Sequence, residues 1–173
     1  SKANELGMRT MQERAYTKRG EQYLLIKSPP ASGKSRALMF IALDKLHNQG
    51  LHQAIVVVPE RSIGGSFADE PLSQHGFYWD WQVAPQWNLC NAPGIGEPRV
   101  AKSKVDAVRT FLISGEKVLV CTHATFRFAV EDLGIDAFDN RLIAIDEFHH
   151  VSANPDNKLG SQLSAFINRD KVH

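Results

Sequence analysis

Four short apolar segments recur along this chain, and they constrain its fold more than any other feature. The segments are YLLIK (23–27), AIVVV (54–58), KVLVC (117–121) and RLIAI (141–145). Strands that are buried on both faces of a sheet are nearly all apolar, as these segments are. Helical patterns lie between them, and strands that alternate with helices form βαβ units. The sequence therefore predicts a three-layer α/β fold with a mainly parallel sheet.

Helices are expected in three places. One spans 34–48 and ends before a glycine, which favours the end of a helix. A second spans 101–114, where apolar residues recur at three- and four-residue spacing, and a third spans 159–168. The stretch 64–98 is rich in proline, glycine and tryptophan. We expect it to form an extended excursion with one hairpin around FYWDWQV.

Composition narrows the class of protein. The 173 residues suffice for one domain with a sizeable core. The 20 Lys and Arg against 19 Asp and Glu give a net charge of +1, which argues against a polybasic tail that collects nucleic acid. Cys90 and Cys121 form no C-x-x-C motif, which favours a reduced, cytoplasmic setting. The longest apolar run, 37–43, is far short of the ~20 residues of a membrane span, so no membrane partner is expected.

The segment SPPASGKS (28–35) lies between the first predicted strand and the first predicted helix. It matches the phosphate-binding pattern G-x-x-x-x-G-K-[ST], except that Ser28 stands where the first glycine is usual. That position is at the hinge from strand to loop and not at the phosphate. Pro29 and Pro30 stiffen the same part of the loop. We therefore expect the loop to bind a nucleotide.

The second half of this loop carries the expected contacts. Main-chain N–H groups are expected to wrap the β-phosphate at the start of the helix, and they belong to Ala31, Ser32, Gly33, Lys34 and Ser35. The ammonium group of Lys34 should reach the β- and γ-phosphate oxygens, which makes Lys34 a catalytic residue as well. The hydroxyl of Ser35 is expected to ligate Mg²⁺. Gly33 is needed because a side chain there would block the approach of the backbone.

Two adjacent carboxylates, Asp146 and Glu147, follow the last predicted strand in the sequence DEFHH. The carboxyl ends of parallel strands are where ligands bind in open α/β sheets. We expect Asp146 to hold Mg²⁺ and Glu147 to orient and deprotonate an attacking water. The loop and these carboxylates are complementary parts of a Mg-nucleotide site, which predicts hydrolysis of a nucleoside triphosphate.

The sequence DEFH resembles the D-E-x-H motif of superfamily-2 helicases and translocases, whose first RecA-like domain also begins with a G-K-S loop. The segment RTMQERA (9–15) resembles the R-x-x-Q-x-x-A element that precedes the loop in that family. The resemblance implies that Gln12, assisted by Arg9, reads the adenine edge, and so implies ATP with Mg²⁺ as the cofactor. It also implies that His149 couples the nucleotide to a second domain.

Two further segments resemble the motifs by which this family binds nucleic acid. VVVPERS (56–62) resembles motif Ia, and VCTHATFRF (120–128) resembles the motif Ib region. In the family, both motifs contact the nucleic-acid backbone. The contacts that the resemblance implies here are Pro59, Arg61, Thr122, His123 and Thr125.

The resemblance covers essentially all 173 residues and is above all to bacterial D-E-x-H proteins near type III restriction translocase subunits and repair helicases. It implies that residues 1–173 are the N-terminal RecA-like ATP-binding helicase domain, truncated before the second RecA-like domain. The implied function is that of an ATP-dependent helicase or translocase motor, with weak ATPase activity as an isolated domain. The implied partners are nucleic acid, with DNA favoured over RNA, the second RecA-like domain, and a nuclease or methylase.

Two other functions stay open from the sequence. A P-loop kinase for a small molecule would share the loop but would need an acceptor pocket and a lid. A module that binds nucleotide and nucleic acid without hydrolysis would share the fold. The presence of Lys34, Ser35, Asp146 and Glu147 favours hydrolysis over such a module.

The protein also has an aromatic cluster, which consists of Phe77, Tyr78, Trp79, Trp81 and Trp87. Such residues could stack on nucleic-acid bases. Large aromatic side chains more often belong to a core or a domain interface, so the core interpretation is favoured.

Overall fold

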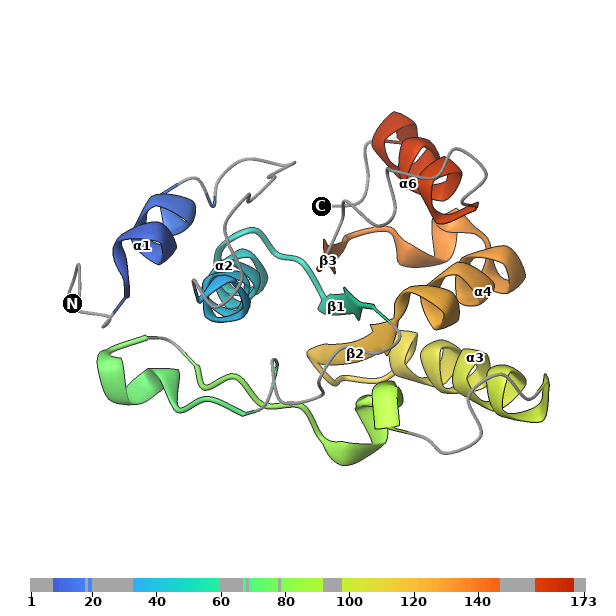
Figure 1. Ribbon diagram of the computed structural model, residues 1–173, viewed down its shortest axis with the longest axis horizontal. Helices are drawn as coiled ribbons and strands as arrows, with labels where there is room; N and C mark the ends of the chain where they lie inside the picture. Colours follow the sequence, from blue (N-terminus) through green and yellow to red (C-terminus); the bar gives the residue numbers. More distant parts are fainter. Residues whose placement is uncertain are drawn as a thin grey trace. The chain divides into compact units, whose positions relative to one another are not determined.

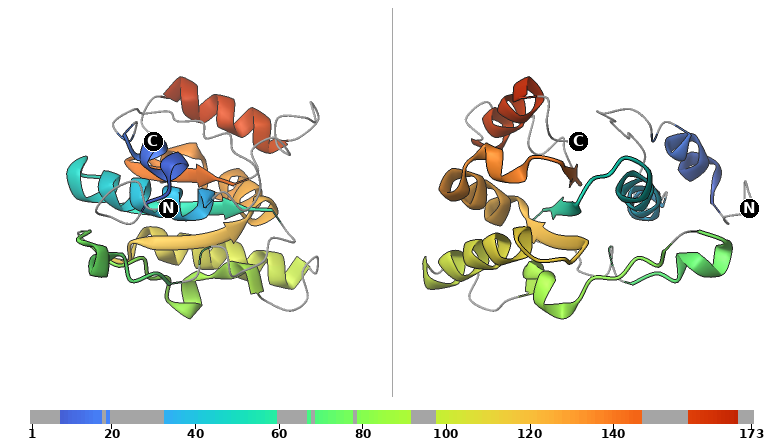
Figure 2. Two further views of the ribbon diagram at one scale, coloured as in Figure 1. Left: turned by 60° about the vertical axis from the view of Figure 1, so that its left-hand side comes forward. Right: turned by 180° about the vertical axis from the view of Figure 1, so that it is seen from behind.

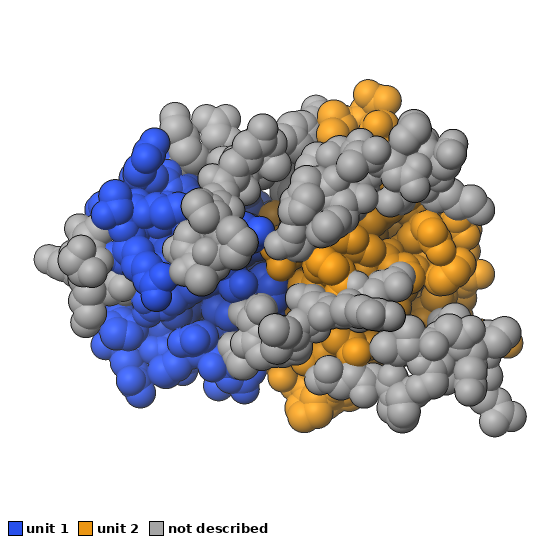
Figure 3. Space-filling view, viewed as in Figure 1, with its two compact units in different colours: residues 1–51, 65–82 blue, residues 52–64, 83–173 orange. Residues whose placement is uncertain are grey.

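The computed structural model describes residues 8–17, 19, 33–59, 67, 69–77, 79–91, 98–146 and 158–169. The protein divides into two compact units, which Figure 3 shows in different colours. Unit 1 comprises residues 1–51 and 65–82, and unit 2 comprises residues 52–64 and 83–173. Each unit has a hydrophobic cluster of its own.

Unit 2 is built on three parallel strands, β1 (Gln53–Val58), β2 (Val118–Thr122) and β3 (Arg141–Ile145). Their order is β2-β1-β3, so β1 pairs with both of the others. Every residue of β1 is buried, as its apolar sequence predicts. Three of the four predicted strands are therefore confirmed to within a residue or two. The first predicted strand, 23–27, lies outside the described residues.

Three helices share a hydrophobic cluster with these strands: α3 (Pro98–Leu112), α4 (His123–Leu133) and α6 (Lys158–Arg169). Helices α3 and α4 lie side by side in unit 2 (Figures 1 and 2). Alternate residues of the strands point into the cluster. There they pack against side chains, many of them phenylalanines, from the three helices and from the 3-10 helix η5 (Ile135–Phe138). The larger members of the cluster are Ile55, Leu119, Val108, Phe111, Phe126, Phe138, Leu159 and Phe166.

The predicted helices at 101–114 and 159–168 are confirmed as α3 and α6, with boundaries that differ by one to three residues. Helix α4 was not predicted, because its sequence follows β2 without a turn and was interpreted only as motif Ib. Among the residues that the structure describes, no helix is both long enough and apolar enough to cross a bilayer.

Two polar side chains join the amino-terminal ends of β1 and β3 to the end of α3. Nε2 of the buried Gln53 donates hydrogen bonds to the main-chain O of Phe111 (2.7 Å) and Glu116 (2.9 Å). Its Oε1 accepts one from Nε of Arg141 (2.8 Å), and Nη2 of Arg141 donates to the main-chain O of Leu112 (2.7 Å). The last C=O groups of a helix have no partner within the helix. These side chains satisfy two of them.

Unit 1 contains α1 (Thr10–Tyr16) and α2 (Lys34–Asn48), which pack against each other. The bounds of α2 are those predicted from the sequence. Ala15 of α1 packs against Ala37 and Ile41 of α2, and these small and branched side chains bring the two helices close together.

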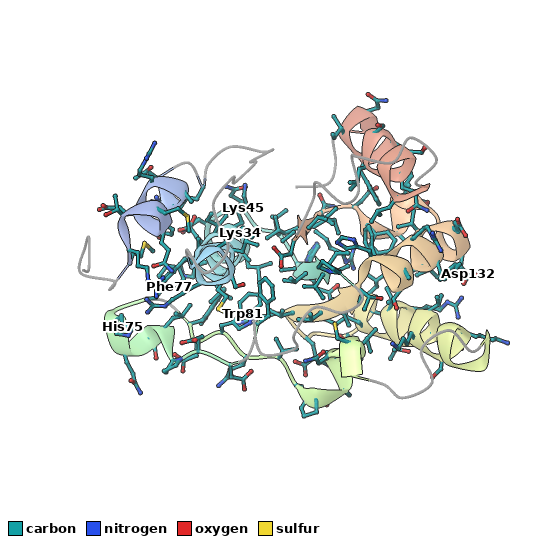
Figure 4. All side chains as sticks on the ribbon, viewed as in Figure 1. Lys34, Lys45, His75, Phe77, Trp81 and Asp132 are labelled. Atoms are coloured by element: carbon teal, nitrogen blue, oxygen red, sulfur yellow. The ribbon has the colours of Figure 1, made fainter. Side chains whose placement is uncertain are left out.

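Two members of the aromatic cluster belong to the interior of unit 1. The ring of Phe77 lies edge-on against Phe40 of α2, with 4.9 Å between the ring centroids. Trp81 is fully buried, and its Nε1 donates a hydrogen bond to the main-chain O of Phe67 (3.2 Å). Figure 4 labels Phe77 and Trp81 among the side chains of this unit. For these two residues the core interpretation is confirmed.

The other tryptophans are half-buried and also make aromatic contacts within their own units. Trp79 lies edge-on to His47, with 5.2 Å between the ring centroids. Trp87 of unit 2 lies edge-on to Phe111, at 5.5 Å. Tyr78 lies outside the described residues.

The hairpin expected around FYWDWQV is wrong, because the only described residue of this segment that forms a bridge, Trp81, pairs with Glu70 outside it. Trp81 makes a single antiparallel bridge with Glu70, and the 3-10 helix η2 (Leu72–His75) lies between these two residues. Both Phe77 and Trp81 are buried, but neither pairs with the other. The reversal of direction therefore comes earlier in the sequence than the aromatic pattern indicated.

We expect Arg141→Met to lower the free energy of unfolding by about 2–4 kcal/mol. The substitution keeps the apolar stem of the side chain but leaves Oε1 of Gln53 and the main-chain O of Leu112 without this donor. Urea denaturation of the two proteins measures the difference.

Arg109→Met is the matched control. The Arg109 side chain is 52% exposed and pairs with Asp106 and Asp132 at the surface, so its loss should cost less than about 1 kcal/mol. Similar costs for the two substitutions would contradict the role given to Arg141.

Candidate functional site

The predicted phosphate-binding loop leads into α2 through Gly33, which has a left-handed conformation with φ of +86°. Lys34 and Ser35 follow it in the first turn of α2, and both are half-buried. The first N–H groups of a helix have no partner within the helix, and the helix dipole adds positive charge there. This end of α2 therefore suits a phosphate. The predicted contacts Ala31 and Ser32 lie outside the described residues.

Gln12 links the element before the loop to the last residue of the loop. Its Oε1 accepts a hydrogen bond from the main-chain N of Arg9 (2.6 Å), and its Nε2 donates one to the main-chain O of Gly33 (2.9 Å). Ala15, three residues further along α1, shares a helix face with Gln12. Both side chains are buried. The spacing of R-x-x-Q-x-x-A thus has a physical reason, since one face of α1 both holds the loop and packs on α2.

The Gln12 amide has more hydrogen-bonding capacity than these two bonds use. A glutamine amide has two N–H donors and two acceptor lone pairs. Within the described residues, Arg9 and Gly33 take one lone pair and one donor. One donor and one acceptor on an amide can pair with the N6 and N7 edge of adenine. The predicted contact with adenine would need the remaining donor and acceptor of this amide.

Two features favour glycine at position 33. Residues with a side chain rarely adopt its positive φ. A Cβ atom at this position would also collide with the side-chain amide of Gln12. The loop motif could not reveal the second feature, because Gln12 lies 21 positions earlier in the sequence.

Asp146 follows β3 directly. Its backbone N–H and C=O both form hydrogen bonds with neighbouring elements of unit 2. Its N–H donates a hydrogen bond to the main-chain O of Val57 in β1 (2.8 Å). Its C=O accepts one from Nε2 of His123 in α4 (2.9 Å). Because a carbonyl oxygen can only accept a hydrogen bond, Nε2 of His123 must carry the proton. Asp146 is 8% exposed. Glu147 and His149, the predicted catalytic base and coupling residue, lie outside the described residues.

The predicted motif Ib residues form the junction between β2 and α4. Thr122 is the last residue of β2 and also the N-cap of α4, and its Oγ1 accepts a hydrogen bond from the main-chain N of Thr125 (3.2 Å). The two hydroxyl groups lie 3.2 Å apart and are buried. The side chains of Thr122, His123 and Thr125 thus make contacts within unit 2.

The predicted residues of unit 2 that the structure describes gather at one edge of the sheet. Pro59 follows β1, Thr122 ends β2, and Asp146 follows β3. Since the three strands are parallel, their carboxyl ends lie at the same edge. Arg61, the remaining predicted contact, lies outside the described residues. The motifs carried no signal for the bond between His123 and Asp146.

Burial opposes ionisation of both cysteines in this unit. Burial raises the pKa of the Cys121 thiol far above its usual value, and the nearby Cys90 thiol adds to the effect. Burial also raises the pKa of Cys90. A raised pKa keeps a thiol protonated and unreactive at neutral pH. Among the residues that the structure describes, no three His, Cys, Asp or Glu side chains gather as a metal site.

We expect Gly33→Ala to lower the free energy of unfolding more than Gly50→Ala does. Gly50 also has a positive φ, +68°, but nothing lies within 4 Å of its Cβ position, so its substitution carries only a conformational cost of about 1–2 kcal/mol. At position 33, the Gln12 amide would also have to shift and lose its bond to the main-chain O of Gly33, which adds about 1–3 kcal/mol. Urea denaturation of both variants measures the two costs.

A double-mutant cycle with Gln12→Ala tests the cause. Because Gln12→Ala removes the colliding amide, the two substitutions together should cost less than the sum of their separate costs. Equal costs for Gly33→Ala and Gly50→Ala would show that the Gln12 amide does not approach Gly33 in solution.

Comparison with known proteins identifies the family. The model of the DEAD/DEAH box helicase family matches residues 9–172. A protein of Bacillus subtilis (strain 168), named "Putative ATP-dependent helicase YeeB", is 54% identical over 172 residues, which are 99% of this chain and 28% of that protein. The chain thus spans little more than a quarter of its relative, and no solved structure matches it significantly. With its parallel sheet and helices, the chain belongs to the DEAD/DEAH box helicase family and has the RecA-like α/β P-loop fold.

Proposed function

We propose that this protein binds and hydrolyses ATP as the first RecA-like domain of a nucleic-acid helicase or translocase. The observation that carries the proposal is the hydrogen bond from Nε2 of Gln12 to the main-chain O of Gly33. It joins a side chain suited to adenine to the start of the helix that bears Lys34. One pair of packed helices would therefore recognise the base and the phosphates together. Membership of the helicase family supports the same function.

The proposed roles of the polar residues follow from their chemistry. Lys34 and the main-chain N–H groups at 31–35 would bind the phosphates. The hydroxyl of Ser35 and the carboxylate of Asp146 offer the oxygen ligands that Mg²⁺ prefers, and bound Mg²⁺ would supply positive charge at the phosphates. Glu147 would orient the attacking water and accept its proton.

We also propose that a nucleic-acid strand binds at the carboxyl edge of the unit 2 sheet. Because the hydroxyls of Thr122 and Thr125 bond to each other, the contact at motif Ib is assigned to main-chain N–H groups in the first turn of α4. Helix N-termini bind phosphate groups in this way. Pro59 and Arg61 would add contacts beyond the end of β1. All of these contacts would be to the backbone of the strand, so binding should be largely independent of base sequence.

The remainder of the motor is proposed to lie in a longer protein. The relative is several times longer than this chain, which leaves room for a second RecA-like domain. Hydrolysis would open and close the cleft between the two domains and so move the strand. His149 would couple the nucleotide to that second domain. The resemblance to restriction and repair proteins favours DNA over RNA and a nuclease or methylase as a further partner.

Calorimetric titration with Mg-ADP tests nucleotide binding. Lys34→Ala should weaken binding at least ~10-fold, because it removes a charge-assisted contact to phosphate. Gln12→Ala should weaken ADP binding and reduce the preference for ADP over GDP. Lys102→Ala, which removes an exposed lysine of α3, is the matched control. A wild-type protein that binds no adenine nucleotide would contradict the proposal.

Hydrolysis is tested separately with Glu147→Gln in the full-length protein. This variant should still bind ATP but hydrolyse it about 10²–10⁴-fold more slowly in the presence of nucleic acid, because it cannot accept a proton from water. Glu116→Gln, at an exposed position before β2, should hydrolyse at the wild-type rate. If the wild-type protein binds ATP but does not hydrolyse it, the non-hydrolysing module is the correct function. Transfer of the phosphoryl group to a small molecule would instead indicate a kinase.

A further inference from the structure

The backbone of Asp146 is connected to both segments that are proposed to contact nucleic acid. Its N–H donates a hydrogen bond to the main-chain O of Val57 in β1. Pro59, a proposed contact, lies two residues after Val57. The C=O of Asp146 accepts a hydrogen bond from the imidazole of His123, which is the first residue of α4 and directly follows the end of β2. The first bond continues the β1–β3 ladder. The second is made by a side chain, so the identity of residue 123 decides whether it exists.

The bond from His123 constrains the peptide group on the carboxyl side of Asp146. A peptide group is planar, so the C=O of Asp146 and the N–H of Glu147 belong to one rigid unit. A donor that fixes the direction of this C=O therefore fixes the plane of the peptide group that Asp146 shares with the next residue. That residue is the proposed base for the attacking water.

The imidazole is attached to a firmly held part of α4. Thr122 caps the helix through its bond to the main-chain N of Thr125, and no loop separates β2 from α4. His123 is the first residue of the helix. A shift of this first turn would therefore move the imidazole and, through it, the C=O of Asp146, instead of being absorbed by a flexible connection.

We propose that His123 is a positioning residue that couples nucleic-acid binding at the first turn of α4 to the nucleotide site, through the backbone carbonyl of Asp146. The inference rests on the proposed function, since it links the two sites named there. A strand that pulls on the α4 turn changes the orientation of the peptide that leads to Glu147. By linkage, a nucleotide that favours one orientation of this peptide changes the affinity for the strand by the same factor.

The experiment measures this coupling in the full-length protein. The affinity for a fluorescein-labelled single-stranded oligonucleotide of mixed sequence is measured by anisotropy, with and without a non-hydrolysable ATP analogue, for both DNA and RNA. The ratio of the two dissociation constants is the coupling factor, which is of the order of 5- to 150-fold in coupled systems. This readout separates coupling from fold stability, because a purely structural defect would weaken both binary complexes.

Three substitutions at position 123 test whether the hydrogen bond to the C=O of Asp146 carries the coupling. His123→Ala removes the donor, and we expect the coupling factor to fall to within about two-fold of unity while each binary affinity stays within about three-fold of wild type. His123→Gln keeps an N–H donor at a similar reach and should retain most of the coupling. His123→Asn has the same amide on a shorter side chain and should behave like alanine. His52→Ala, which removes an exposed histidine before β1, should leave the factor unchanged.

Each outcome decides between the possibilities. Wild-type coupling in His123→Ala, or equal coupling in the Gln and Asn variants, would overturn the proposal, and the second comparison still applies if the alanine variant fails to fold. A loss of oligonucleotide affinity in His123→Ala without nucleotide would also overturn it and make His123 a direct contact. A wild-type protein that binds both ligands without coupling would refute this inference alone. A wild-type protein that binds neither would refute the proposed function.

Discussion

The parallel pairing of β1 with both neighbouring strands is the constraint on which unit 2 depends. The strand is buried along its whole length, so the groups at its two ends must be satisfied by other elements. At the amino end, the Gln53 side chain holds the end of α3 and the guanidinium of Arg141. At the carboxyl end, the main-chain O of Val57 holds Asp146. One edge of the sheet thus holds the end of α3, and the other presents the residues with proposed chemistry.

The apolar segments and the loop motif predicted most of the described fold. The three described strands are short and mostly buried, and such strands leave a clear apolar pattern in sequence. Helix α2 was predicted with its bounds because a glycine precedes it and a second glycine follows shortly after its end. Helix α4 was missed because Thr122 serves both as a strand residue and as a cap, so no turn residues separate the elements. The aromatic segment showed that residues are buried, but burial alone does not reveal which partner Trp81 pairs with.

The polar links between residues far apart in the sequence could not be predicted. Gln53 bonds to a carbonyl 58 positions away and to an arginine 88 positions away. The imidazole of His123 bonds to a carbonyl 23 positions away. Hydrophobic periodicity does not reveal which distant group a glutamine in an apolar strand, or a histidine after a threonine, will bond to. The candidate site was therefore predicted as a set of residue types at a sheet edge, and the structure added how their backbones are held.

The direct junction between β2 and α4 also limits how the sequence can vary. Each residue added or removed between Cys121 and Phe126 would turn α4 by about 100°, because an α-helix has 3.6 residues per turn. Such a turn would take Phe126 out of the hydrophobic cluster and His123 away from Asp146. Relatives of this protein should therefore keep a fixed length here. Differences in length should collect instead in the excursion between β1 and α3, where the described backbone forms only short helical turns and isolated bridges.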